Sequence, residues 1–329
     1  MNLYTKVDIP ATNFKIDYSS RLAFFGSCFA DNISAQFAER KFKVMANPFG
    51  TVYNPISLAS QAKAIAEGKV FKDKDVFKDE RCDGLWHCWS AHSSLSAHTR
   101  EESIDKMNAA TELARDFLQK ADVVFVTLGT SFVYFLKGNG EPISNCHRQD
   151  PNLFTRRMIS VEEATDAIRE TVTSIRQLNT NTSIVLTVSP LRHMSDGAHN
   201  NTLSKATLQL AVDKIVKCGT KIAAATYFPS YEIVMDELRD YRFYADDMIH
   251  LSKTAEAYIF ERMVSAYCDE RTREDMAKVE KFLKMASHRI QDESAPASQE
   301  FLKKLNAQAT LLESDIPGLD LSDEKRPVK

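Results

Sequence analysis

The sequence lacks a long apolar run, and this absence excludes several classes of protein. No stretch of about 18 consecutive apolar residues occurs in its 329 residues, so no membrane-spanning helix and no membrane partner are predicted. The first residues, MNLYTKVDIPATNFKID, have no basic start followed by an apolar stretch and do not resemble a secretory signal. We therefore expect a cytoplasmic protein.

An excess of positive charge is also missing. The 42 Lys and Arg residues are balanced by 45 Asp and Glu residues, which argues against a nucleic-acid partner. Neither a Gly-x4-Gly-Lys loop nor a Gly-x-Gly-x-x-Gly turn is present, so no nucleotide and no other cofactor is expected. The six cysteines are scattered along the chain, which predicts reduced thiols and no disulfide framework.

What the sequence does contain is an alternation of apolar runs and helical patterns. Apolar runs of the kind found in buried strands occupy residues 21–25, 42–46, 121–129, 182–190 and 221–229. Amphipathic helical patterns occupy residues 30–41, 103–121, 160–179, 204–218 and 252–267. This order predicts an α/β protein of three layers, with a mostly parallel five-stranded sheet between helices.

The C-terminal part differs in composition from the rest. Residues 273–290 and 298–314 are predicted to form two charged amphipathic helices, and residues 315–329 a frayed tail. We therefore divide the chain into a domain at residues 1–268 and a helical appendage with a tail at residues 269–329. Self-association through these helices is a further expectation.

Small and polar residues follow the expected strands, where open parallel sheets bind their ligands. Ser27 stands where the first strand turns into a helix, near free N–H groups that can stabilise an oxyanion. Asp247 and His250, three residues apart before the last helix of the sheet domain, would supply an orienting carboxylate and a base. The alternatives are Cys28 as the nucleophile, a purely structural turn, and an ordinary helix cap with a surface histidine.

Five motifs in order resemble one protein family over residues 1–268. They are FGSCFADNI, NPFGTVYNP, TLGTSFVY, TVSPLRH and YFPSYEIVMDELRDYRFYADDMIH, and they are similar to the GSCFA family, a relative of the SGNH/GDSL hydrolase superfamily. The resemblance implies a flavodoxin-like SGNH hydrolase fold, with Ser27 as nucleophile and Asp247 and His250 as its partners. It also implies that the N–H group of Gly50 joins the oxyanion hole.

The third motif departs from the superfamily pattern. The superfamily carries Gly-x-Asn-Asp there, and its Asn completes the oxyanion hole, whereas this chain has Thr130 and neither Asn nor Asp. Thr130, Asn54 and Asn145 are the residues that could replace the missing donor. If none of them does, a slow or inactive site is expected.

Residues 82–98 gather cysteine, histidine and tryptophan side chains. Cys82, His87, Cys88, His92 and His98 could in principle hold zinc, but their spacing matches no familiar zinc motif, so no metal is expected. Trp89 and His92 would instead suit a loop that lines a substrate pocket. His193, after the fourth strand, and Asn145 are the other expected substrate contacts.

Together these features predict an SGNH-like serine esterase or acyltransferase that acts on an O-acyl ester through an acyl-enzyme. By analogy with the superfamily, the substrate would be a carbohydrate or other small-molecule ester. The alternative is a former hydrolase that now binds a glycan or small metabolite, and the missing Asn favours it. A Ser27→Ala variant that binds its ligand without turnover would separate the two.

Overall fold

A computed structural model describes residues 5–218, 224–290, 292 and 295–327 of the protein. Its central sheet has five parallel strands in the order β2-β1-β5-β9-β10. The strands are β1 (Arg21–Gly26), β2 (Lys43–Ala46), β5 (Val123–Leu128), β9 (Ser183–Val188) and β10 (Thr226–Tyr227). The predicted sheet is confirmed, although residues 221–223 of the fifth expected strand lie outside the described residues.

Successive side chains of the inner strands enter two separate apolar cores. In β1, Leu22 and Phe24 belong to one core, whereas Ala23 and Phe25 belong to the other. Strands β5 and β9 alternate in the same way. This explains why the sequence shows continuous apolar runs, because neighbouring side chains point to opposite faces and both faces are covered.

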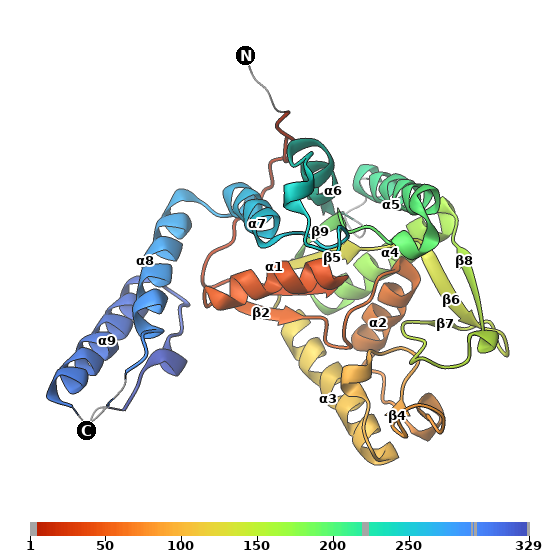
Figure 1. Ribbon diagram of the computed structural model, residues 1–329, viewed down its shortest axis with the longest axis horizontal. Helices are drawn as coiled ribbons and strands as arrows, with labels where there is room; N and C mark the ends of the chain where they lie inside the picture. The colour runs from red at the N-terminus through yellow and green to blue at the C-terminus, as the bar shows by residue number, and fades with distance from the viewer. Residues whose placement is uncertain (1–4, 219–223, 291, 293–294, 328–329) are drawn as a thin grey trace.

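Helices cover both faces of the sheet (Figure 1). One core is closed by α1 (Cys28–Glu39) and α7 (Lys253–Tyr267). The other is closed by α2 (Pro55–Glu67), α3 (Arg100–Leu118), α4 (Val161–Leu178) and α5 (Ala198–Lys217). The molecule therefore has the predicted three layers.

Several elements were not predicted from the sequence. Helix α2 is capped by Asn54, whose Oδ1 accepts the N–H of Ser57 at 2.8 Å, starts with Pro55 and ends at Gly68 in a left-handed conformation. Each of these is an ordinary helix boundary signal. The other additions are a three-stranded antiparallel sheet and a hairpin, formed by β6 (Phe132–Leu136), β7 (Pro142–Ile143), β8 (Phe154–Met158), β3 (Phe77–Lys78) and β4 (Trp86–His87).

The chain between β10 and α7 is irregular. It forms α6 (Ser230–Glu232), a π-helical turn at Ile233–Glu237 and a 3-10 turn at Tyr241–Phe243. Its last residues lead into α7 and carry the expected Asp247 and His250.

Helices α8 (Glu270–Ala286) and α9 (Pro296–Asp315) lie side by side at one end of the molecule (Figure 1). Their apolar residues continue the core that α1 and α7 close. The expected frayed tail also packs there, because Leu319 and Leu321 are buried and Lys41 pairs with Glu324 at 2.6 Å. The division of the chain at residue 268 remains a prediction. None of the described helices is both long and apolar enough to cross a membrane.

We expect Phe282→Ala in α8 to destabilise the whole molecule, because Phe282 is fully buried in the core shared with α1 and α7. A truncation of this kind lowers the free energy of unfolding by about 3–5 kcal/mol. Leu311→Ala in α9 is the matched control, since Leu311 is 60% exposed and such changes stay within about 0.5 kcal/mol. Urea unfolding is followed by circular dichroism and by the fluorescence of Trp86 and Trp89, which lie outside α8 and α9. An early transition seen by circular dichroism alone would instead mean that the two helices unfold as a separate unit.

Candidate active site

The turn between β1 and α1 is fixed by a close approach of two strands. Gly26 has a φ of +128°, and a Cβ added there would lie 2.0 Å from the carbonyl oxygen of Thr127 in β5. Its N–H donates to Asn47 Oδ1 at 2.7 Å. Only glycine satisfies these conditions, so the small residue before Ser27 is a requirement of the backbone.

Ser27 occupies the N-cap position of α1, but its side chain does not cap the helix. The residue is 1% exposed, and its Oγ has no hydrogen-bond partner in the described part of the chain. Buried hydroxyl groups are normally paired. The Ser27 hydroxyl is therefore placed for a role other than holding the turn together.

Asp247 and His250 form the pair that the sequence predicted. His250 Nδ1 donates to Asp247 Oδ2 at 2.6 Å, and the N–H groups of Ile249 and His250 donate to Asp247 Oδ1 at 2.9 Å. The hydrogen bond from the His250 ring makes the largest contribution to the pKa of Asp247, and together these bonds lower it to about 2. An ionised Asp247 therefore holds the imidazole in one orientation and leaves Nε2 free to act as a base.

Ser27 and His250 line the same cavity of about 500 Å³. The His250 side chain is 55% exposed, and no hydrogen bond joins it to Ser27 among the described residues. Catalytic hydrogen bonds are often long before a substrate is bound. Polar residues that follow the sheet strands also line the cavity, as predicted. They are Thr51, Thr130, Ser189 and His193.

The three expected oxyanion residues are held in different ways. The N–H of Gly50 donates to the carbonyl of Asn47 at 2.7 Å, and Gly50 does not line the cavity. Asn54 lines the cavity, but its amide caps α2 through Ser57. Thr130 lines it too, with its hydroxyl 3.0 Å from that of Ser204.

Asn145 lines the cavity, and only its amide oxygen is engaged by a described residue. Its Oδ1 accepts the N–H of His147 at 2.8 Å, while its Nδ2 donates to no other described residue. The loop after β7 therefore brings to the cavity wall an amide that no described residue engages, at a different place from the superfamily's Asn.

The other expected substrate contacts divide into two groups. His92 and His193 line the cavity, and burial lowers the pKa of His193 to about 4, so this ring is neutral near pH 7. Trp89 does not line it, because the indole stacks on Phe77 at 3.8 Å and packs edge-on against Phe154. Trp89 therefore supports the loop that carries His92.

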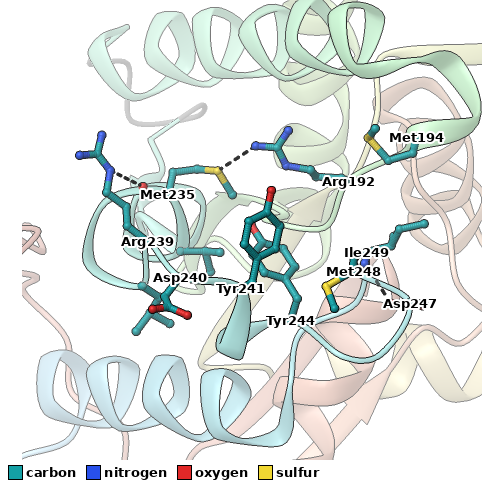
Figure 2. A pocket seen from close by; sticks show the side chains of 12 residues that line it. Arg192, Met194, Met235, Arg239, Asp240, Tyr241, Tyr244, Asp247, Met248 and Ile249 are labelled. Atoms are coloured by element: carbon teal, nitrogen blue, oxygen red, sulfur yellow. Dashed lines mark hydrogen bonds between the residues drawn. The ribbon is translucent and has the colours of Figure 1, made fainter.

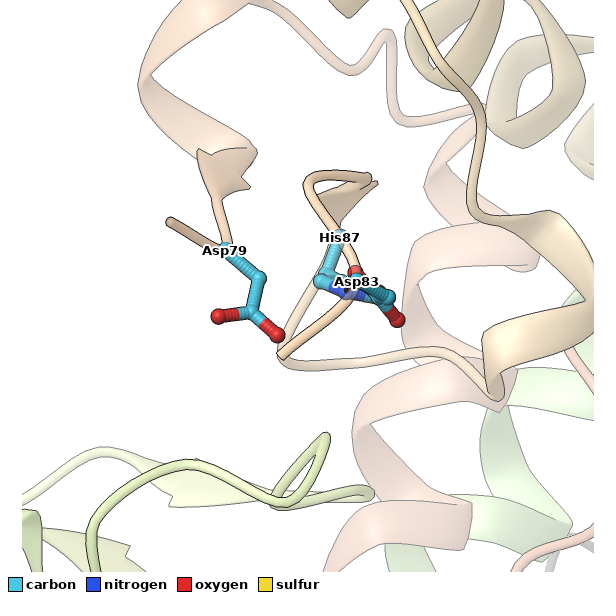
Figure 3. A group of neighbouring side chains, drawn as sticks. All are labelled: Asp79, Asp83 and His87. Carbon is cyan, nitrogen blue, oxygen red and sulfur yellow. Dashed lines mark hydrogen bonds and ion pairs between the residues drawn. The ribbon is translucent and has the colours of Figure 1, made fainter. Parts of the chain in front are cut away.

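One group of side chains in the described residues has the composition of a metal site. Single ligand atoms of Asp79, Asp83 and His87 lie within 4.8 Å of one another (Figure 3). However, the His87 ring nitrogens are paired with Ser96 at 2.6 Å and with Asp83 at 3.1 Å. Asp79 Oδ1 accepts two backbone N–H groups of the following turn. These bonds anchor the loop, whereas the other Asp79 oxygen, Oδ2, is buried and has no hydrogen-bond partner among the described residues.

Lys205 in α5 is a part of the site that sequence reasoning missed. Its Nζ donates to the carbonyl of Gly129 at 2.6 Å and to that of Ser189 at 2.7 Å, and thus joins the ends of β5 and β9. The side chain is fully buried, which lowers its pKa from 10.5 to about 7. No sequence signal marked it, because lysine in an amphipathic helix normally lies on the solvent side.

Positive charge predominates around the cavity. Arg156 and Arg192 line it, and Lys205 lies behind its wall, where it donates to the carbonyl of Ser189. Arg156 is paired with Asp196 at 2.5 and 2.8 Å, whereas Arg192 has no acidic partner among the described residues. The site is therefore suited to groups that carry or develop negative charge.

Comparison with known proteins gives a family match and a likeness to solved structures. A sequence model of the GSCFA family matches residues 21–263. No curated protein matches the chain. Among solved structures, the acetyl xylan esterase Est2A from the rumen bacterium Butyrivibrio proteoclasticus is similar at 13% identity and a TM-score of 0.33, covering 75% of this chain. The chain spans 63% of that protein's length.

We expect Lys205 to make stability depend on pH. Because burial lowers its pKa from 10.5 to about 7, the unfolded chain binds more protons than the folded chain between these values. The free energy of unfolding contributed by Lys205 therefore rises with pH over that window. In urea unfolding measured from pH 6 to 9, the midpoint of wild type should increase relative to that of Lys205→Met as the pH rises.

Lys214→Met is the control, since Lys214 lies on the same helix, half exposed, and pairs with Glu162 at 2.9 Å. Its curve should stay parallel to that of wild type. A Lys205→Met curve parallel to wild type would contradict the assignment.

Proposed function

Because the chain belongs to the GSCFA family, we propose that it is a serine esterase or acyltransferase that forms an acyl-enzyme on Ser27. One observation carries the proposal. The buried, unpartnered hydroxyl of Ser27 and the ring of His250 line one cavity, and His250 is oriented by Asp247. A nucleophile, a base and a residue that orients the base are the set that acyl transfer requires.

In the proposed reaction, Ser27 Oγ attacks the ester carbon and its proton passes to His250 Nε2. The electron pair of the carbonyl bond moves to the oxygen and gives a tetrahedral oxyanion. His250 then returns the proton to the alcohol oxygen as the ester bond breaks, leaving an acyl-serine. Water or an acceptor alcohol repeats the sequence in reverse, and Asp247 stabilises the imidazolium in both halves.

The oxyanion is stabilised by donors at the start of α1 and by the amide of Asn145. The first N–H groups of a helix have no partner within it, so those of the turn at Ser27 are available. Asn145 Nδ2 supplies the donor that the altered third motif lacks, and Thr130 and Asn54 hold the cavity wall. Gly50 joins the hole only if its bond to Asn47 opens. The positive charge of Arg192 favours the same negative oxygen.

Ser27 is a better nucleophile than Cys28 in this setting. Burial, and after it the carboxylate of Asp31, raises the pKa of the Cys28 thiol, so little thiolate is present near neutral pH. A serine needs no thiolate, because its base removes the proton during attack. Polar cavity residues such as His92, Asn145 and His193 suit the hydroxyl groups of a carbohydrate or other small ester.

We expect Ser27→Ala to reduce the turnover of p-nitrophenyl acetate by roughly 10³-fold or more, and His250→Ala to do nearly the same, because the two residues act as a unit. Cys28→Ala is the matched control at the neighbouring position and should stay within a few-fold of wild type. Release of p-nitrophenol gives kcat and KM for each variant.

A Ser27→Ala protein as active as wild type would contradict the proposal. Wild type that is folded and cleaves no ester, yet binds a glycan or metabolite in this cavity, would favour the binding-protein alternative.

A further inference from the structure

A second and larger cavity lies beside the catalytic one. It has a volume of about 730 Å³, within the range of small-molecule sites. Its walls come from the irregular chain after β10 and from the residues after β9, and we call it the 233–249 cavity (Figure 2). Most of its lining is apolar or aromatic: Met194, Met235, Leu238, Tyr241, Tyr244 and Met248.

The two cavities share part of their walls. Arg192 and Ile249 line both of them. Asp247 lines the 233–249 cavity, while His250, to which it is hydrogen-bonded, lines the catalytic cavity. The two cavities are therefore neighbours that meet at Arg192 and Ile249.

The rim of the 233–249 cavity exposes three apolar or aromatic side chains. Tyr241 is 78% exposed, Met248 52% and Met194 42%. Met248 also has a φ of +58°, a conformation that side chains other than glycine rarely adopt. Strained, exposed apolar residues next to a reactive pair are typical of ligand sites, because the ligand buries them.

The cavity also has a cation at its junction with the catalytic site. Among the described residues, the guanidinium of Arg192 donates a hydrogen bond to the sulfur of Met235 at 3.6 Å and has no carboxylate partner (Figure 2). The second arginine, Arg239, lies 3.6 Å from Asp236. An apolar space with an unpaired cation at its mouth matches an ester, which has an apolar body and electron-rich oxygens.

We propose that the 233–249 cavity binds an apolar group of four or more carbons that belongs to the substrate. Arg192 then contacts an oxygen of the same molecule. This inference rests on the proposed function, because the catalytic cavity holds the ester group. It makes the substrate an ester with a sizeable apolar part and not a simple acetate. The apolar part belongs either to the acyl group or to the alcohol, and two ester series separate these sources.

The first series keeps the alcohol constant, from p-nitrophenyl acetate to the hexanoate, and the second keeps the acetyl group constant, from methyl to hexyl acetate. Each buried methylene contributes up to about four-fold in kcat/KM, so we expect at least a roughly ten-fold rise along one series. Tyr241→Ser should reduce that rise several-fold, and the exposure of Tyr241 makes unfolding by this change implausible. Leu311→Ser, at an exposed apolar residue of α9, is the control and should keep the wild-type ratio.

A direct binding measurement keeps this inference distinct from the proposed function. Calorimetric titration of Ser27→Ala with acetate, hexanoate and hexan-1-ol should show tighter binding of hexanoate if the acyl series rises, or of hexan-1-ol if the alcohol series rises. Tyr241→Ser and Arg192→Gln should weaken that binding. If no ester is cleaved but hexanoate or hexan-1-ol binds in this way, the cavity stands and the proposed function fails. If esters are cleaved at rates independent of chain length in both series, and Tyr241→Ser behaves as wild type, the inference is overturned while the enzyme stands.

Discussion

The whole site depends on the close approach of β1 to β5 at Gly26. Because a side chain there would collide with the carbonyl oxygen of Thr127, the backbone turns at a glycine and enters α1 at Cys28, two residues later. That geometry places Ser27 at the carboxyl edge of the sheet, beside the residues that follow β5 and β9. Lys205 links these two strand ends, because its Nζ donates to the carbonyl groups of Gly129 and Ser189. The position of Ser27 is thus set by backbone packing, and not by hydrogen bonds of its own side chain.

The charged groups around the cavity determine which bound species it stabilises. The site combines an ionised Asp247 and a neutral His193 with Arg192, which has no acidic partner among the described residues. Such a field stabilises an oxyanion more than a neutral ester, which is the difference that accelerates a reaction. In our account this field compensates in part for the absent Asn of the third motif, together with the free amide of Asn145.

The sequence allowed the sheet, most long helices and the Ser27, Asp247 and His250 arrangement to be predicted, because each depends on local patterns. Apolar runs mark the buried strands. Asp247 and His250 can pair without any distant contact, because they lie three residues apart before one helix. Asn54 shows where local reading was incomplete, since Asn-Pro followed by a distant Gly marked it as the cap of α2. Lys205 and Trp89 could not be placed, because their roles arise from contacts between residues far apart in the chain. The sequence predicts a frayed tail, because the few apolar residues of the tail are buried only by core residues that lie far away in the chain.

The central claim is that Ser27 is an activated nucleophile, and intact-mass analysis after treatment with a fluorophosphonate probe tests it most directly. The account predicts a single covalent adduct on wild type and on Cys28→Ala, a much slower adduct on His250→Ala, and none on Ser27→Ala. An unlabelled, folded wild type at high probe concentration, or an adduct that persists in Ser27→Ala, would contradict it.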